Sequence, residues 1–220
     1  MQKIPPKEIL NQVYQRLEDA FGPQHWWPAD TSFEVIIGAI LTQSTAWINV
    51  EKAIRNLKKY KLLTPQAIKK IPLKRLAGII RPAGYYNQKA KKIKNFIHFL
   101  FDNYQGSIKR MFLKDLALRS QLLGINGIGP ETADSILLYA GNKPIFVVDA
   151  YTRRILSRHN LVRNDNSYNE IQNYFMDNLK NEVKLFNQYH ALIVRLGKEI
   201  CKPKPNCRVC PLRGIGERIK

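Results

Sequence analysis

The stretch from Leu122 to His159 constrains the fold more than any other part of the sequence. An apolar segment ends at Gly127-Ile128-Gly129, where glycine allows the backbone to turn sharply. Pro130 follows at a place suited to the first position of a helix. Four apolar residues then recur on one helix face: Ala133, Ile136, Leu137 and Ala140. The pattern predicts two helices joined by a tight hairpin, and a connector that brings Asp149 to the start of a further helix.

The hairpin has the properties of a phosphate site, and it lies in a strongly basic chain. The first amides of a helix have no intrahelical partner and meet a partial positive charge, so they can hold a phosphate. The chain carries 36 Lys and Arg against 17 Asp and Glu, a net charge of +19. This excess indicates an anionic polymer as partner. Contacts to a phosphate backbone would bind nucleic acid without reading its sequence.

Composition and periodicity predict a globular, all-α protein. Hydrophobic residues make up 45% of the 220 residues, which is enough for a buried core, and no segment has a convincing strand-like alternation. No apolar run reaches membrane-spanning length, and the N-terminus lacks the core of a signal peptide. We therefore expect a cytoplasmic, nucleoid-associated protein.

Three segments outside the hairpin carry candidate functional side chains. Trp26-Trp27-Pro28 places two indoles in a turn-like segment, where one of them can line a cavity. A helix that begins near Phe33 has apolar residues on one side, and Gln43 lies off that apolar stripe. The third tryptophan is Trp47. Four lysines crowd the early turns of a helix that ends near Tyr104 and form a candidate phosphate surface: Lys89, Lys91, Lys92 and Lys94.

Together these motifs resemble the helix-hairpin-helix–GPD superfamily of DNA glycosylases, the relatives of endonuclease III. The matching segments are the hairpin, Thr132-Ala133 at the start of its second helix, Val147-Val148-Asp149, and Gly38 to Trp47 around Gln43. The resemblance implies an all-α, two-lobed fold with the active site in the cleft between the lobes. A helical-barrel lobe would span residues 29–141, and the second lobe would combine residues 1–28 with 142–220.

The resemblance also implies roles for single residues. Asp149 would be the catalytic aspartate, which stabilises an oxocarbenium-like sugar and orients or deprotonates the attacking water. An aspartate there is also well suited to cap a helix. Gln43 would enter the duplex where the target nucleotide leaves it, offsetting part of the cost of extrusion. Four residues would meet the DNA backbone at the hairpin: Gly127, Ile128, Gly129 and Thr132. The implied partner is damaged double-stranded DNA, bound by a monomer.

Residue 131 bears on the reaction type. Relatives that also cut the DNA strand carry a lysine two residues after the hairpin, and this chain has Glu131 there. A carboxylate cannot form a Schiff base with the sugar. We therefore expect a monofunctional glycosylase that leaves an abasic site. Adenine-mismatch relatives need an acidic residue late in the glutamine helix, where this chain has Gly38.

The tryptophans bear on the lesion. Trp-Trp-Pro before the glutamine helix and an aromatic residue after the glutamine resemble the 3-methyladenine DNA glycosylase III branch. Alkylated purines such as 3-methyladenine and 7-methylguanine are cationic, and indole faces attract a flat cation more than a neutral base, by roughly 0.5–2 kcal/mol. The expected lesion pocket contains Trp26, Trp27 and Trp47, with Lys198 and Lys204 reaching the pocket or the DNA.

All three cysteines lie in the C-terminal tail, which is unlike a secreted disulfide framework: Cys201, Cys207 and Cys210. They resemble the iron–sulfur loop of the family, whose cubane normally takes four thiolates, but the fourth position is Gly216. A 4Fe–4S cluster with a non-cysteine or solvent ligand, and a loop that folds without metal, both remain open. Zinc with a histidine is a further possibility, although His159 and His190 have no finger-like spacing to the cysteines.

Two other functions compete with removal of alkylated purines. One is an endonuclease III-like glycosylase for oxidised or mismatched pyrimidines; Glu131 and the three tryptophans speak against the oxidised-base version. The other is a helix-hairpin-helix protein that only binds DNA. Such a binder is not expected to retain Asp149 and Gln43.

Overall fold

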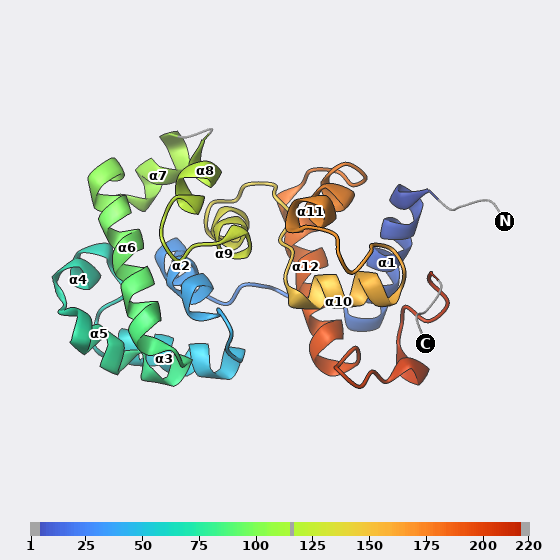
Figure 1. The fold of residues 1–220 in the computed structure, drawn as a ribbon, viewed down its shortest axis with the longest axis horizontal. Coiled ribbons are helices and arrows are strands. Elements are labelled where there is room, and N and C mark those ends of the chain that lie inside the picture. The colour runs from blue at the N-terminus through green and yellow to red at the C-terminus, as the bar shows by residue number, and fades with distance from the viewer. Residues whose placement is uncertain (1–4, 115–116, 217–220) are drawn as a thin grey trace. The chain divides into compact units, whose positions relative to one another are not determined.

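The computed structural model in Figure 1 describes residues 5–114 and 117–216. Every regular element in these ranges is helical, which confirms the predicted all-α class. The α-helices are α1 (Pro6–Phe21), α2 (Ser32–Leu41), α3 (Trp47–Lys59), α4 (Pro65–Lys70), α5 (Leu73–Ile79), α6 (Tyr86–Tyr104), α7 (Ile108–Lys114), α8 (Leu118–Leu123), α9 (Pro130–Ser135), α10 (Ala150–Arg158), α11 (Tyr168–Met176) and α12 (Val183–Glu199). The other helical turns are η1 (Arg81–Ala83), the π-helix η2 (Ile136–Ala140) and η3 (Cys207–Val209).

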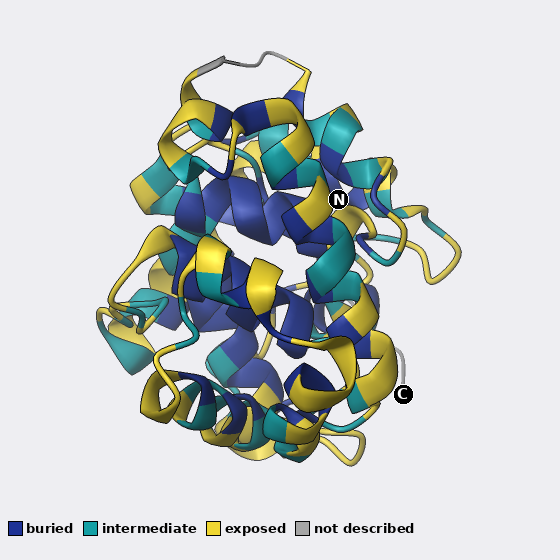
Figure 2. Cartoon of the chain, turned by 90° about the vertical axis from the view of Figure 1, so that its left-hand side faces the viewer, coloured by how far each residue is buried: buried dark blue, intermediate teal, exposed yellow. Residues whose placement is uncertain are grey.

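The chain divides into two compact units. Unit 1 combines Met1–Pro28 with Lys143–Lys220, and unit 2 is Ala29–Asn142. The lobes implied by the resemblance include residues 1–4, 115–116 and 217–220, which lie outside the described residues. Each unit has its own buried core, and Figure 2 shows exposed residues, in yellow, on loops and outward helix faces.

Unit 2 is built around α2. Thr31 caps this helix by accepting a hydrogen bond from the Glu34 amide at 3.1 Å, and α2 packs against α3, α6, α9 and η2. The prediction that α2 is buried on one side only was wrong, because every residue from Phe33 to Leu41 is buried. Glu34 is buried among them, and Lys58 on α3 neutralises its carboxylate at 2.8 Å. Because other helices surround α2, its sequence lacks the polar stripe that would mark an exposed face.

Unit 1 is built around α12, which packs against α1 and α10. Leu10, Val13 and Leu17 form the buried stripe of α1, and the hydroxyl of Tyr189 on α12 donates to the Leu10 carbonyl at 2.8 Å. Next to this contact lies an aromatic core in which Phe146 stacks on Phe175 with centroids 3.7 Å apart. Phe186 and Tyr189 meet Phe146 edge-on.

Two arginines of α10 fold back onto the chain. Helical periodicity alone would place Arg154 and Arg158 on the outward side of the helix. Instead Arg154 donates to the carbonyls of Gly197 and Cys201, each at 2.9 Å, and Arg158 donates to those of Lys202 and Pro203 at 2.6 and 2.9 Å. The C-terminal loop has few helical hydrogen bonds of its own, so these guanidinium groups satisfy its carbonyls. Among the described helices, none has the length and apolarity that crossing a membrane requires.

Candidate active site

The hairpin of unit 2 joins α8 to α9, and Pro130 occupies the first turn of α9 as predicted. Gly127 has φ +95, which L side chains rarely adopt, and a Cβ there would lie 2.3 Å from Cγ of Lys92. Gly127 is therefore required both for the turn and for the close approach of α6. Gly129 has an ordinary φ of −92 and open space around it. Ile128 is buried beneath the turn.

Gln43 follows the end of α2 and is hydrogen bonded through both ends of its amide. Its Nε2 donates to the Gly127 carbonyl at 3.0 Å and to the Thr132 hydroxyl at 2.9 Å. Its Oε1 accepts from the Lys92 ammonium at 2.6 Å. The structure thus brings the predicted wedge residue onto the predicted hairpin. Thr132 is buried, and its hydroxyl serves Gln43 rather than solvent.

The lysines of α6 are not the open phosphate surface that the sequence suggested. Lys89 is buried, and its ammonium donates to the carbonyls of Leu41 and Ala83 at 2.9 and 2.7 Å. Burial lowers the pKa of Lys89 to about 8, and the nearby Lys92 ammonium adds to the shift. Lys94 donates to the carbonyls of Ile68, Lys69 and Ile71, whereas Lys91 is exposed. Unsatisfied carbonyls at helix ends attract cations, and Lys89 and Lys94 bind such carbonyls. Lys92 instead holds Gln43.

Three further predicted positions of unit 2 have different surroundings. Glu131, at the position of the lyase lysine, is exposed in the first turn of α9. Gly38 is buried inside α2. Trp47 is half-buried and opens α3.

Asp149 of unit 1 caps α10 and is also the residue predicted to be catalytic. The buried segment Phe146-Val147-Val148 leads to it, fixed by bonds from Gln172 to the Phe146 carbonyl and from the Val148 amide to the Tyr168 hydroxyl. Asp149 Oδ1 accepts from the amide and the hydroxyl of Thr152 at 2.7 and 2.8 Å. Because the cap uses Oδ1 alone, Oδ2 keeps its capacity to accept a further bond.

His190 on α12 faces this second oxygen, a neighbour that the sequence alone does not indicate. Its Nε2 lies 3.7 Å from Asp149 Oδ2, and both side chains are mostly buried, with 7% and 12% exposed. Burial lowers the pKa of His190, opposed by the Asp149 carboxylate and assisted by the Lys198 ammonium. The imidazole is therefore neutral at neutral pH, and the pair is not an ion pair. The helical spacing of apolar residues on α12 could have indicated that His190 points into the core. It could not have indicated that His190 meets Asp149.

The two adjacent indoles are half-buried in a loop that α12 holds in place. Trp26 and Trp27 have centroids 5.7 Å apart and planes inclined by 59°. Upstream of them, the Gln188 amide group accepts from the Gln24 amide at 2.9 Å and donates to the Gly22 carbonyl at 3.1 Å. Lys198 carries its ammonium over the Trp26 ring at 5.3 Å from the centroid, a cation–π contact.

Helix α12 therefore supplies neighbours both to Asp149 and to the indole pair. Lys204, also predicted to serve the lesion pocket, is exposed in the C-terminal loop. Of the two predicted lysines, Lys198 is the one that contacts a predicted pocket residue.

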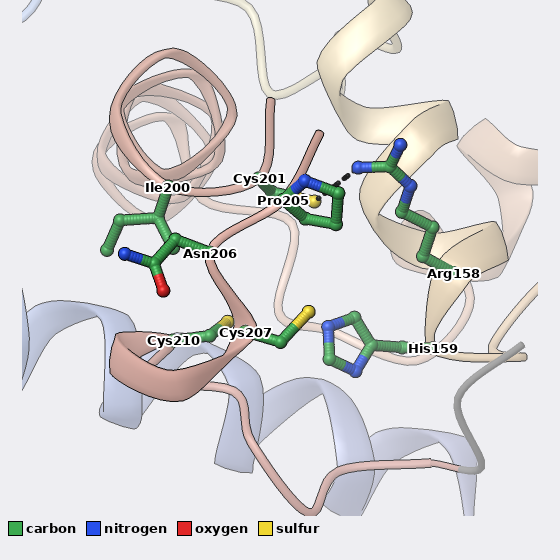
Figure 3. Close-up of a pocket in the computed structure, with 8 residues that line it drawn as sticks. All are labelled: Arg158, His159, Ile200, Cys201, Pro205, Asn206, Cys207 and Cys210. Atoms are coloured by element: carbon green, nitrogen blue, oxygen red, sulfur yellow. Dashed lines mark hydrogen bonds between the residues drawn. The ribbon is translucent and has the colours of Figure 1, made fainter. Parts of the chain in front are cut away.

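The three cysteines line one cavity of about 80 Å³ in unit 1, together with five other residues (Figure 3). The others are Arg158, His159, Ile200, Pro205 and Asn206. Figure 3 shows the His159 ring beside the Cys207 sulfur, with Cys201 at the side of Arg158. Within residues 5–114 and 117–216, no three His, Cys, Asp or Glu side chains are grouped so that they could hold a metal ion. A site for a single ion such as zinc is therefore not formed there.

Residues 37–181 match the sequence model of the HhH-GPD superfamily base excision DNA repair proteins. A Methanocaldococcus jannaschii protein named as a proposed DNA repair glycosylase shares 47% sequence identity with this chain, over 94% of each of the two chains. The crystal structure of Helicobacter pylori 3-methyladenine DNA glycosylase bound to 1,N6-ethenoadenine has 30% identity and a TM-score of 0.77, covering 89% of this chain and 98% of that one. A trapped endonuclease III–DNA covalent intermediate has 25% identity and a TM-score of 0.83, covering 98% and 96%.

These similarities extend over both units, and the family match alone spans more than half of the sequence. They agree with the all-helical fold described above. The chain belongs to the HhH-GPD superfamily of base excision DNA repair proteins.

Proposed function

We propose that this chain is a monofunctional DNA N-glycosylase that extrudes alkylated, cationic purines such as 3-methyladenine from duplex DNA and excises them. The observation that carries this proposal is the pairing of an indole face with a cation in the same unit as Asp149. Lys198 holds its ammonium 5.3 Å from the Trp26 centroid. The contact supports an indole face that attracts a cation, and a flat cationic base would be attracted to the same face in place of the ammonium.

Asp149 would act on the sugar. As the N-glycosidic bond breaks, positive charge develops on the sugar ring, and a nearby carboxylate stabilises it. Oδ1 stays fixed by Thr152, so Oδ2 would face the reacting sugar or the attacking water. Neutral His190 leaves the negative charge of Asp149 uncompensated at this distance, which preserves its effect on a developing cation.

A cationic purine needs little help to depart as a leaving group, because it leaves as a neutral base. The carboxylate and the water are then the main requirements for hydrolysis. Glu131 at the position of the lyase lysine supports a reaction that stops at the abasic site, since a carboxylate forms no Schiff base with the sugar.

Unit 2 would supply the DNA contacts. Gln43 would leave its bonds to Gly127 and Thr132 to fill the gap of the extruded nucleotide, or would enter the gap while keeping part of them. The hairpin amides at the start of α9 would hold a backbone phosphate. Because such contacts release counterions, binding would weaken steeply with rising salt.

The named activities of the similar proteins also support this proposal. The Helicobacter pylori relative is a 3-methyladenine DNA glycosylase, and its crystal structure holds 1,N6-ethenoadenine. The second candidate function is a glycosylase for oxidised or mismatched pyrimidines, which the similarity to endonuclease III favours. A binder without catalysis is the third.

The test is base release from a panel of duplexes. One set contains 3-methyladenine and 7-methylguanine, a second contains uracil or thymine opposite guanine, and a third contains an oxidised pyrimidine. Released bases are identified by chromatography, and strand breaks are scored before and after alkali. The matched control is Asp149→Asn, which keeps the helix cap because Asn and Asp cap equally well.

Release of methylated purines, with breaks only after alkali, is the expected result. Preferential release of a pyrimidine would assign the chain to the second candidate function. Breaks before alkali would overturn the monofunctional assignment. Binding of every duplex without release of any base would leave the DNA-binding role.

A further inference from the structure

We infer that Lys89 is a positioning residue for Gln43: its buried ammonium fixes the chain at the end of α2, and from there the Gln43 side chain reaches the hairpin. The inference rests on the proposed function, because it concerns how the residue that would fill the duplex gap is held before extrusion. It involves residues of unit 2 alone.

The first observation is the burial of the Lys89 ammonium. The residue is 2% exposed, and its Nζ donates to the carbonyl of Leu41 at 2.9 Å and to the carbonyl of Ala83 at 2.7 Å. Leu41 lies in the last turn of α2 and Ala83 ends η1, so neither carbonyl has an intrahelical partner. Burying a cation is costly unless its N–H groups are bonded. This ammonium therefore ties the end of α2 to the turn that precedes α6.

The second observation is the place of Leu41, two residues before Gln43. Between them, Thr42 ends the helix by directing its amide and its hydroxyl to the Gly38 carbonyl, at 2.9 and 2.7 Å. After Gln43, Ser44 has φ +51, in the left-handed region that few residues adopt. The chain thus turns as soon as it leaves α2. The direction of Gln43 consequently depends on where the Leu41 carbonyl is held.

The third observation is that α6 holds Gln43 at two points. Lys89 and Lys92 are three residues apart on α6, so their side chains leave the same face of the helix. Lys89 binds the backbone before Gln43, and Lys92 donates to Gln43 Oε1 at 2.6 Å. The other end of the amide donates to Gly127 and Thr132. Helix α6 packs on α2 (Figure 1), and it fixes both the start and the tip of the Gln43 side chain.

Lys94 gives a comparison within the same helix. Its ammonium also donates to carbonyls at a helix end, but that end belongs to α4, where the acceptors are Ile68, Lys69 and Ile71. Both lysines should therefore contribute to the stability of unit 2. Only Lys89 binds the end of α2, so only Lys89 should affect Gln43.

The experiment compares Lys89→Met with Lys94→Met in the full chain. Methionine keeps a long, unbranched stem and removes the ammonium. Glutamine side chains are labelled with ¹⁵N, and the exchange of their amide protons with water is measured by NMR. The Gln43 signal is assigned by its absence from Gln43→Ala, and urea unfolding gives the stability of each variant. Single-turnover base release is measured on a duplex with one paired 7-methylguanine, for Lys89→Met, Gln43→Ala and the double variant.

The amide protons of Gln43 should exchange slowly in the wild type, because Nε2 donates two hydrogen bonds. Lys89→Met should speed this exchange by roughly 10-fold, the effect of weakening a local structure by about one hydrogen bond. Lys94→Met should leave it within about 2-fold of the wild type, although both variants lose stability.

Base release should fall by about 3- to 10-fold in Lys89→Met, up to the effect expected for loss of Gln43 itself. In the Gln43→Ala background, the same substitution should cost less than about 2-fold, because Lys89 acts through Gln43. Where Lys89→Met does not fold, Lys89→Gln replaces it. The glutamine retains one donor group, so the same changes should be smaller.

Three results would overturn the inference. The first is unchanged exchange of the Gln43 amide in the folded Lys89 variant. The second is equal acceleration in Lys94→Met. The third is an equal loss of base release with and without Gln43, which would reduce Lys89 to a contributor to stability. If the wild type releases no base, the proposed function fails, and the amide exchange still decides whether Lys89 holds Gln43.

Discussion

The candidate functional residues of the two units are held in different ways. In unit 2, Gln43 has both ends of its amide hydrogen bonded, to Lys92, Gly127 and Thr132. In unit 1, Asp149 uses only Oδ1 in the helix cap, and Trp26 meets a lysine ammonium over one ring face. The first arrangement fixes a position, whereas the second leaves Asp149 Oδ2 outside the helix cap and places a cation on the Trp26 ring. The difference predicts that mutations in unit 1 affect the chemical step most, and mutations in unit 2 affect extrusion.

The largest effect should come from Asp149→Asn. Without the carboxylate, neither the developing sugar cation nor the attacking water is supported, and single-turnover base release should fall by roughly 10²- to 10⁴-fold. Asparagine keeps the cap, so the free energy of unfolding should change by less than about 1 kcal/mol. DNA affinity, measured by fluorescence anisotropy, should stay within a few-fold. Retention of more than a tenth of the wild-type rate would reduce Asp149 to a helix cap.

The next largest effect should come from Gln43→Ala. Extrusion of a base costs a few kcal/mol, and loss of the side chain that fills the gap should slow release from paired duplex by roughly 10-fold. The same variant should be close to wild type on a lesion opposite an abasic site, where no partner base has to be separated. Equal slowing on both substrates would mean that Gln43 does not act as a wedge.

Lys92→Met is the companion variant. It keeps an unbranched stem against Gly127 and removes the ammonium that holds Gln43 Oε1. Its effect should have the same substrate dependence as that of Gln43→Ala but be smaller, because the two bonds from Gln43 Nε2 remain.

The hairpin, the helix starts and the cap could be predicted from the sequence because each depends on local geometry. Pro130 at a first helical position and Thr31 and Asp149 as caps are properties of a few consecutive residues. The fates of Lys89 and Arg154 could not be predicted in the same way. A long cationic side chain lies in water unless a distant carbonyl comes within reach, and that depends on packing between helices far apart in the sequence.

The candidate site divides along the same line. Asp149, Gln43 and Trp26 stand in recognisable motifs, whereas His190 meets Asp149 from α12, which shows mainly an apolar repeat in the sequence. Likewise, the spacing of the cysteines indicated a missing ligand at Gly216, but only the fold shows that a side chain there would meet the backbone of His159.

A smaller effect should come from Trp26→Leu. Leucine keeps apolar volume and removes the ring quadrupole, so the preference for a cationic purine over a neutral one should fall by about 5-fold, which corresponds to about 1 kcal/mol. For the same variant, the rate of release of 3-methyladenine is compared with the rate of release of an uncharged purine analogue. A uniform loss on both bases would point to packing of the loop rather than to attraction of a cation.

The smallest effect should be a pH dependence of stability carried by His190. Its folded pKa lies below the ordinary value of 6.5, chiefly because of burial, while the Asp149 carboxylate opposes the shift and the Lys198 ammonium adds to it. Below pH 6.5 the unfolded chain therefore takes up a proton that the folded chain does not. The free energy of unfolding should fall as pH decreases from 6.5 towards the lower folded pKa, by at most about 1.4 kcal/mol per pH unit from this group.

His190→Gln removes this titration, so its stability should decline less than that of the wild type between pH 7 and pH 5.5 in urea unfolding experiments. His98→Gln is the matched control, because His98 is exposed and should change nothing. Parallel pH profiles for wild type and His190→Gln would mean that Asp149 compensates the burial of His190 fully. The neighbouring carboxylate would then be part of an ion pair, and the contrast between a fixed Gln43 and an uncompensated Asp149 would fail at this point.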